Sequence, residues 1–446
     1  MKLLLGFSSL LSIICTVAGN NHNHHNGDDQ QAITGQLLGE PHLANKKLSD
    51  VIAASPVLSL HRAICEIESI TDNELGVGKL LISILEAHNF TVKTQSVPAP
   101  NSNNSTKDRF NVYAYPDVLK YSSSGSPSMN KDHIMTKPKV LLSSHIDTVP
   151  PHIPYSLSLS KSGSSRDDIL ISGRGTVDDK ACVAVQLQTA LDLLSSGEIS
   201  PADVALLFVV GEEKRGDGMR AFSDSELYKA SNSGYKAILF GEPTEGKLAA
   251  GHKGIEMLTL KARGKAAHSG YPWLGRSANS MILPALMVLD TLGDIPETEG
   301  GLPRSDKYGK STVNIGFMQG GVAGNVVPEF AMADITFRLA GGTVSEVREI
   351  VTRAIRKVDP EGLLELVFSQ GYGPIPLDAD VKGFDTITVN YGTDVPNLDV
   401  EEGVKRYLYG PGSILVAHGR NEGLTVGDME VALAGYKKLV KHALEL

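Results

Sequence analysis

The chain has 446 residues, of which 42 are lysine or arginine and 51 are aspartate or glutamate, giving a formal net charge of −9 at pH 7. This length allows two folding units, and the apolar content is ordinary for a soluble globular protein. No cluster of lysine and arginine accompanies the mildly acidic balance, which argues against nucleic acid as a partner.

The first 18 residues have the pattern of a signal peptide. Met1 and Lys2 precede an apolar run from Leu3 to Val17, and a small residue, Ala18, follows it. The run is too short for a comfortable membrane span, so we expect cleavage near Ala18 rather than an uncleaved anchor. No later segment is apolar for long enough to cross a bilayer, so we expect a secreted, extracellular protein with no membrane association.

Other features fit a secretory route. Asn89, Asn103 and Asn104 each begin an Asn-x-Ser/Thr triplet and are predicted glycosylation sites. Two cysteines remain after cleavage, Cys65 and Cys182; we expect them to be unpaired, although secretion would permit a bond between them.

Residues 19–47 are polar and lack periodicity, which predicts a disordered leader or propeptide. Residues 122–135 are similarly loose and predict a surface insertion.

After the leader, short β-rich runs alternate with helical periods. The runs expected to form strands are Lys139–Ser144, Val204–Val210, Lys236–Phe240 and Ser413–Ala417. Residues 181–196 have one apolar helical face, and a second helix is expected from a capping threonine at 425 to the C-terminus. This alternation predicts an α/β domain, formed by residues 48–252 and 369–446, whose sheet has helices on both faces.

Residues 253–368 have a different pattern. Apolar and polar residues alternate near residues 258–262, 313–317 and 331–339, as in half-buried antiparallel strands. Helical periods are interleaved at Ala278–Leu292 and Val344–Val358. The order β-α-β-β-α-β predicts a ferredoxin-like α+β domain inserted into the first domain.

Polar residues with metal-ligating side chains lie next to the predicted strands and helices of the first domain. They are His145, Asp147, Asp178, Glu212, Glu213, Glu242 and His418. Most of them follow a strand, and the carboxyl edge of an open α/β sheet is where ligands bind, so we expect them to meet in space. Imidazole and carboxylate groups without thiolates favour a catalytic zinc site, and a shared carboxylate suits two ions.

Each of these motifs also has a plain structural interpretation. Asp178 and Asp179 resemble the acidic pair at a helix N-terminus, and Glu212 and Glu213 resemble a solvated turn. His268 lies in a turn-rich stretch of the inserted domain, where a surface histidine is the ordinary expectation. A catalytic metal site is favoured only because all of these metal-ligating residues lie next to predicted strands and helices in a consistent way.

Seven stretches resemble the di-zinc exopeptidase family of carboxypeptidase G, aminoacylase, acetylornithine deacetylase and succinyl-diaminopimelate desuccinylase, and are most similar to its secreted carboxypeptidases. They are SSHIDTVPP, SGRGTVDDK, VVGEEKRGDGM, FGEPTEGK, AAHSGYP, GNVVPE and LVAHGRNEG. The resemblance implies a zinc-exopeptidase-like mixed sheet flanked by helices, with the inserted domain serving as a lid or dimerisation domain. It also implies a possible homodimer.

The same resemblance implies roles for individual residues. Two Zn2+ ions per subunit would be held by His145, Asp178, Glu213, Glu242 and His418, with Co2+ or Mn2+ as possible substitutes.

The remaining roles implied by the resemblance belong to residues that do not bind metal. Glu212 would be the general base acting on a zinc-bridging water, and Asp147 would orient His145. His268 would stabilise the oxyanion from a partner subunit, while Asn325 and Arg338 would hold a substrate carboxylate.

Three functions follow as hypotheses. The first is a secreted metallocarboxypeptidase that cleaves a peptide or amide bond adjacent to a free carboxylate. The second keeps the chemistry but acts on N-acyl amino acids, as a deacylase. The third is a non-catalytic binding protein that retains the fold; it would be expected to have lost a ligand or the base, and none is lost here.

Overall fold

The computed structural model of the protein describes residues 41–98, 108–118, 137–159, 165–231, 234–369 and 371–446. The expected signal peptide, most of the expected leader, Asn103, Asn104 and the expected insertion at 122–135 lie outside these ranges. Among the described residues, no helix is both long enough and apolar enough to cross a membrane.

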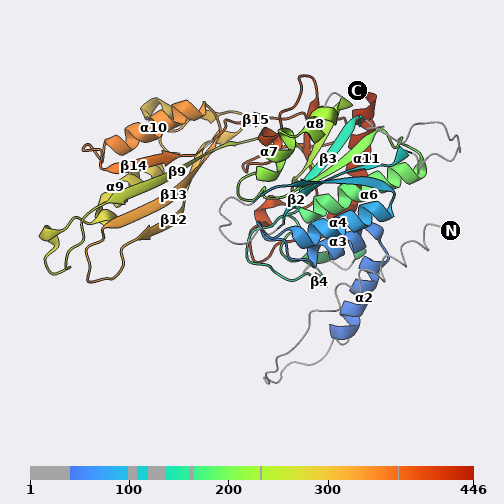
Figure 1. The fold of residues 1–446 in the computed structure, drawn as a ribbon, viewed down its shortest axis with the longest axis horizontal. Coiled ribbons are helices and arrows are strands. Elements are labelled where there is room, and N and C mark those ends of the chain that lie inside the picture. The colour runs from blue at the N-terminus through green and yellow to red at the C-terminus, as the bar shows by residue number, and fades with distance from the viewer. Residues whose placement is uncertain (1–40, 99–107, 119–136, 160–164, 232–233, 370) are drawn as a thin grey trace.

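A six-stranded mixed sheet forms the centre of the larger part of the molecule (Figure 1). Its strands, in spatial order, are β1 (Phe90–Ser96), β2 (Phe110–Pro116), β6 (Val204–Val209), β3 (Val140–His145), β7 (Ala237–Gly241) and β17 (Lys405–Tyr409). β6, β3, β7 and β17 run parallel to one another. β2 is antiparallel to its neighbour β6, and β1 is antiparallel to β2. Every residue of β3, β6 and β7 is buried, as expected for strands covered on both faces.

Helices cover both faces of this sheet. They are α3 (Pro56–Cys65), α4 (Leu75–Ala87), α6 (Lys180–Ser196), α7 (Asp217–Ser223), α8 (Glu226–Ser231) and α11 (Val426–Glu445), and a further helix, α2 (Pro41–Ala53), packs against α3. One apolar core packs α3, α4, α6 and α11 against one face, and a second core packs α7 and α8 against the other. The predicted ends of two helices are confirmed: Gly197 closes α6 in the left-handed conformation, and Thr425 begins α11 with a capping box.

Short elements complete this part. Two small sheets have the orders β18 (Gly423–Thr425), β5 (Ile169–Ser172), β4 (Ser156–Leu159) and β15 (Ile375–Pro376), β8 (Leu248–His252), β16 (Thr386–Val389). Single 3-10 turns occur at η1 (Arg166–Asp168), η5 (Val395–Asn397) and η6 (Ile414–Val416).

The inserted segment has its own sheet and its own apolar core (Figure 1). Its elements, in chain order, are β9 (Gly254–Arg263), η3 (Pro272–Leu274), α9 (Ala278–Thr291), η4 (Glu297–Glu299), β10 (Arg304–Ser305), β11 (Gly309–Lys310), β12 (Thr312–Gly320), β13 (Phe330–Leu339), α10 (Val344–Arg356) and β14 (Leu364–Phe368). The four long strands are antiparallel in the order β12, β13, β9, β14. This is the predicted β-α-β-β-α-β unit, so the expected fold class is confirmed.

Two expectations about local structure are wrong. Ser413–Ala417 is not a strand: Ile414–Val416 forms η6, Ser413 accepts a hydrogen bond from the backbone of Leu415, and Leu415 is 86% exposed. Short apolar runs do not distinguish strand from turn by periodicity, and here the run is too exposed to belong to the sheet. In addition, helix α2 begins at Pro41, so residues 41–47 are helical rather than part of a disordered leader.

Cys65 and Cys182 are both buried and unpaired, as expected.

Candidate metal centre

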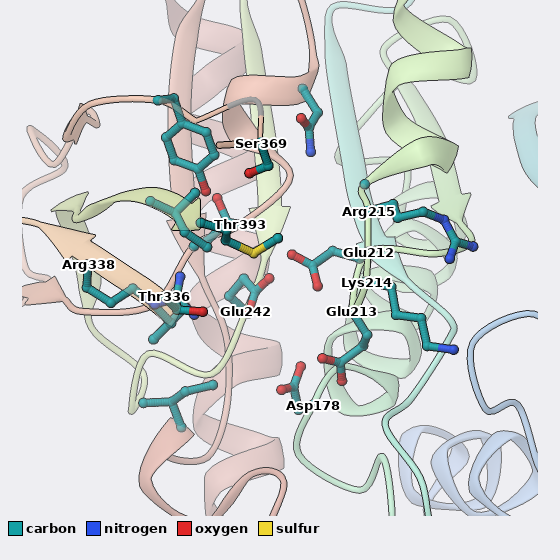
Figure 2. Close-up of a pocket in the computed structure, with 18 of the residues that line it drawn as sticks. Asp178, Glu212, Glu213, Lys214, Arg215, Glu242, Thr336, Arg338, Ser369 and Thr393 are labelled. Carbon is teal, nitrogen blue, oxygen red and sulfur yellow. The ribbon is translucent and has the colours of Figure 1, made fainter. Parts of the chain in front are cut away.

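Most of the predicted site residues lie at the carboxyl ends of neighbouring parallel strands. His145 is the last residue of β3, Glu212 and Glu213 lie in the turn after β6, and Glu242 directly follows β7. Because these strands are adjacent, their carboxyl ends bring the side chains to one edge of the sheet. Figure 2 shows the carboxylates of Asp178, Glu212, Glu213 and Glu242 directed into a shared space.

The turn after β6 depends on a glycine. Gly211 has a φ of 75°, and a Cβ at this position would lie 2.0 Å from Asp217 Oδ1 and 2.2 Å from Arg109 Nη2. Arg109 is almost fully buried and pairs with Glu74 and Asp217. The chain therefore turns closely around a buried arginine just before Glu212.

Asp178 is placed between two histidines. It lies immediately before α6, whose N-cap is Asp179, and the bond between the two aspartates is cis. Its Oδ1 lies 3.0 Å from His145 Nε2, and its Oδ2 lies 3.3 Å from His418 Nε2. Each oxygen of this one carboxylate thus faces a different imidazole.

The remaining candidate ligands fall on the two sides of Asp178. Glu213 Oε2 lies 3.0 Å from His418 Nε2. On the other side, His145, Glu212 and Glu242 have ligand atoms within 4.8 Å of one another, and so do His145, Asp178 and Glu213. All five predicted metal ligands are therefore in one cluster. His418 belongs to it although it follows a 3-10 turn rather than the expected strand.

Asp147 is fully buried beside the cluster and supports it. His145 Nδ1 lies 3.0 Å from the main-chain oxygen of Asp147 and 3.5 Å from its carboxylate. The carboxylate also accepts hydrogen bonds from the backbone N–H groups of Glu212 and Glu213, and from the hydroxyl of Thr71. Asp147 therefore contacts His145, the residue it is predicted to orient, and also accepts hydrogen bonds from the turn that carries both glutamates.

The electrostatics of the cluster are dominated by buried carboxylates. Burial raises the pKa of Glu212 and Glu242 well above the usual carboxyl range, and nearby carboxylates add to this effect. Hydrogen bonds to Asp178 and Glu213 raise the pKa of His418 to about 10. Burial lowers the pKa of His145, but hydrogen bonds to Asp147 and Asp178 outweigh burial and raise it well above its usual value. The carboxylates thus stabilise positive charge on the neighbouring histidines.

The residues present fit a divalent cation. Among the described residues, no lysine or arginine forms an ion pair with Asp178, Glu212, Glu213 or Glu242. Glu213 Oε1 is buried and has no hydrogen-bond partner. Nitrogen and carboxylate donors without a thiolate match the preferences of catalytic zinc.

A pocket of about 440 Å³ opens over the cluster. Arg338 and Thr336, from β13, lie on the side opposite Glu212 and Glu213 (Figure 2). No carboxylate of the described residues pairs with the Arg338 guanidinium, which is half-buried. A free cation therefore faces the carboxylate cluster across the pocket.

Several lining residues were not anticipated from the sequence. They include Lys214, Arg215, Arg220, Ile255, Met257, Ser369, Tyr372, Tyr391, Thr393, Asn397 and Ile414. One signal near them is Gly392, where a Cβ would lie 3.1 Å from Arg338 Nη1 and 2.5 Å from the Tyr372 hydroxyl. A glycine with two such neighbours indicates close packing around a site, but those neighbours are distant in sequence.

Two predicted residues lie elsewhere. His268 and Asn325 are exposed in the inserted segment, where the backbone N–H of Ser269 donates to the Asn325 carbonyl. Neither belongs to the described residues that line the pocket. The Asn325 side chain is thus separated from Arg338, with which it was expected to act.

Family models match both parts of the chain. Residues 250–363 match the M20 peptidase dimerisation domain, and residues 128–240 match peptidase family M28. A relative from Aspergillus niger, named "Probable carboxypeptidase", is 54% identical over 401 residues, covering 89% of this chain and 92% of the relative.

Solved structures show the same fold at low sequence identity. A tripeptidase from Staphylococcus aureus has a TM-score of 0.65 at 20% identity and covers 88% of this chain and 98% of that structure. An M20 family metallo-carboxypeptidase from Sulfolobus solfataricus has a TM-score of 0.60 at 17% identity and covers 88% of this chain and all of that structure.

Proposed function

Because the chain belongs to the M20 metallopeptidase family and is a carboxypeptidase-type hydrolase, we propose that it binds two zinc ions and removes C-terminal residues from peptides outside the cell. The observation that carries the proposal is the position of Asp178, whose two carboxylate oxygens face different histidines. A carboxylate in this position suits a bridge between two metal ions. Glu213 and His418 would hold one ion together with Asp178, and His145 and Glu242 would hold the other.

Glu212 is the general base in this proposal. When bound, zinc polarises the scissile carbonyl and lowers the pKa of water at the site. The Glu212 carboxylate takes a proton from the attacking water and returns it to the leaving amine nitrogen. Burial supports this role, because it raises the pKa of Glu212 and favours a group that is protonated for part of the cycle. The Asp147 carboxylate holds Glu212 in place by accepting a hydrogen bond from the Glu212 backbone N–H.

Arg338 is the proposed anchor for the free carboxylate of the substrate. Its guanidinium lines the pocket and has no carboxylate partner among the described residues. A planar fork of N–H donors suits a bidentate bond to a C-terminal carboxylate. The distance across the pocket then sets which bond lies beside Glu212.

His268 and Asn325 are proposed to act in a second copy of the chain. Both are exposed in the segment that matches a peptidase dimerisation domain. In a homodimer, His268 would donate a hydrogen bond to the oxyanion that develops at the partner's scissile carbonyl, and Asn325 would assist in binding the substrate.

Secretion of the protein rests on the N-terminal sequence. The apolar run that ends before Ala18 supports a cleaved signal peptide, and Asn89, one of the proposed glycosylation sites, is exposed.

Replacing Glu212 with glutamine should strongly reduce turnover without loss of metal. We expect wild-type protein to contain two zinc ions per chain by elemental analysis, and Glu212→Gln to retain both. The kcat of this variant should fall by about 10²–10⁴, the usual contribution of general acid–base catalysis. Glu198→Gln, at an exposed surface position, is the control and should retain wild-type kcat. Wild-type turnover by folded, zinc-loaded Glu212→Gln would remove this residue from the mechanism.

Loss of the Arg338 guanidinium should weaken recognition of the substrate carboxylate. For Arg338→Ala we expect kcat/KM on peptides with a free C-terminus to fall by about 10–100-fold, the value of a charged hydrogen-bonded pair. Peptides with an amidated C-terminus should be poor substrates of both proteins and should be affected little. Arg338→Lys should be intermediate, because it keeps the charge but loses the fork.

The same substrate panel separates peptidase from deacylase activity. Release of acetate from N-acetyl amino acids, with no release of C-terminal residues from peptides, would overturn the carboxypeptidase proposal.

Two inactive variants should complement each other if His268 acts across a dimer. Mixing Glu212→Gln and His268→Ala chains in equal amounts, under conditions that allow subunit exchange, makes half of the dimers mixed. Each mixed dimer has one complete site, so activity should recover to about one quarter of the wild-type value. Additive residual activity in the mixture would show that His268 does not act in a partner's site.

The location of the enzyme can be read from the mature protein. Protein purified from the medium of the producing cells should begin near Gly19, because cleavage is expected after Ala18. Its mass should fall on enzymatic deglycosylation, and Asn89→Gln should lose part of that shift. Full-length protein found only inside the cells would contradict secretion.

A further inference from the structure

A buried ion pair lies behind the metal centre and has no part in the mechanism described above. Arg174 Nη1 lies 2.6 Å from Glu422 Oε2, and the two side chains are 3% and 1% exposed. The residues are separated by 248 positions in the sequence. Removing two charges from water is unfavourable unless further hydrogen bonds satisfy both partners, and both side chains make such bonds here.

Glu422 holds the backbone of the proposed bridging ligand. Its Oε1 accepts hydrogen bonds from the backbone N–H groups of Val177 and Asp178, at 3.2 and 3.3 Å. Both oxygens of the Glu422 carboxylate are therefore occupied, one by the arginine and one by the segment that carries Asp178. Movement of Glu422 would move the backbone of Asp178 with it.

Arg174 holds the segment that carries the opposite histidine. Its guanidinium donates to the carbonyl oxygens of Gly419 and His418, at 3.3 and 3.4 Å, and to that of Pro151, at 3.2 Å. His418 has a φ of 62°, a left-handed conformation that non-glycine residues seldom adopt. The bond from Arg174 to the His418 carbonyl therefore supports an uncommon backbone conformation at a proposed ligand.

The ion pair joins the hydrogen bonds that Glu422 makes to the Asp178 segment with those that Arg174 makes to the His418 segment. Neither Arg174 nor Glu422 is among the described residues that line the substrate pocket, so neither contacts substrate there. We propose that Arg174 and Glu422 form a positioning clamp that sets the distance between Asp178 and His418 for metal binding. This inference rests on the proposed function, in which both residues bind zinc.

A purely stabilising ion pair would behave differently from a clamp. Its loss would lower the free energy of unfolding but would leave the affinity of the folded protein for zinc unchanged. Loss of the clamp displaces two ligands without changing their chemistry, and groups that orient metal ligands typically contribute 10–100-fold to metal affinity.

The test is zinc affinity measured on folded protein. Glu422→Gln keeps the size of the side chain but removes the charge and places an amide where two donor groups converge. We expect its affinity for the more weakly bound zinc, measured by competition with a chromophoric chelator, to fall by about 10–100-fold. The visible spectrum of the cobalt-substituted protein should also change, since the spectrum reports ligand geometry, while KM for peptide should change little.

Two further variants keep the test decisive. Arg174→Lys retains the charge but cannot reach the same set of carbonyls, so it should also lower zinc affinity, and it provides a second measurement if one variant fails to fold. The matched control is Glu256→Gln in the inserted segment, where Glu256 is fully buried and pairs with Arg348 at 2.6 Å. This control should lower thermal stability without changing zinc affinity.

The outcomes separate the clamp from the proposed function. If wild-type protein binds two zinc ions and folded Glu422→Gln and Arg174→Lys bind them with wild-type affinity and an unchanged cobalt spectrum, the clamp is overturned and the proposed function stands. If wild-type protein binds no zinc, the proposed function itself fails.

Discussion

The concentration of buried carboxylates at one edge of the central sheet is the constraint on which the rest of the structure depends. Asp178 and Glu242 are buried beside Glu212 and Glu213, and only histidines form ion pairs within this group among the described residues. Like charges in such an arrangement repel, so their positions must be imposed by the backbone. The fully buried parallel strands, the close turn at Gly211 and the start of α6 impose them.

The surrounding polar groups act mainly on the backbone of the ligand segments. Asp147 accepts the N–H groups of Glu212 and Glu213, and Glu422 accepts that of Asp178. Arg174 donates to the carbonyl of His418. The segments that carry the candidate ligands are thereby positioned through their backbone groups, while their side chains face the pocket.

Features that depend on local sequence could be predicted. The buried strands before His145, Glu212 and Glu242 follow from short β-rich runs, and the capping box at Thr425 follows from two residues three positions apart. Alternating patterns in the inserted segment were enough to predict its order of elements. The strand predicted at 413–417 is wrong because the composition of this run suits a strand, whereas its exposure, which the sequence does not reveal, excludes one. His418 nevertheless lies in the cluster, because the turn at η6 leads to the same edge of the sheet.

Long-range pairings could not be predicted. Nothing near Arg174 in the sequence indicates a partner 248 positions away, and the pocket wall at Tyr372 and Tyr391 has no periodic signature. The positions of His268 and Asn325, outside the pocket of their own chain, likewise depend on tertiary structure.

The pocket is lined by residues from both parts of the chain, each of which has its own apolar core. Arg338, Thr336, Ile255 and Met257 come from β9 and β13 of the inserted sheet, whereas the carboxylate cluster comes from the central sheet. Under the proposed function, the anchor for the substrate carboxylate, Arg338, and the general base, Glu212, are encoded in separate stretches of the gene. Mutations confined to β9 and β13 can then change how the substrate is held, while the metal ligands and Glu212 are inherited unchanged.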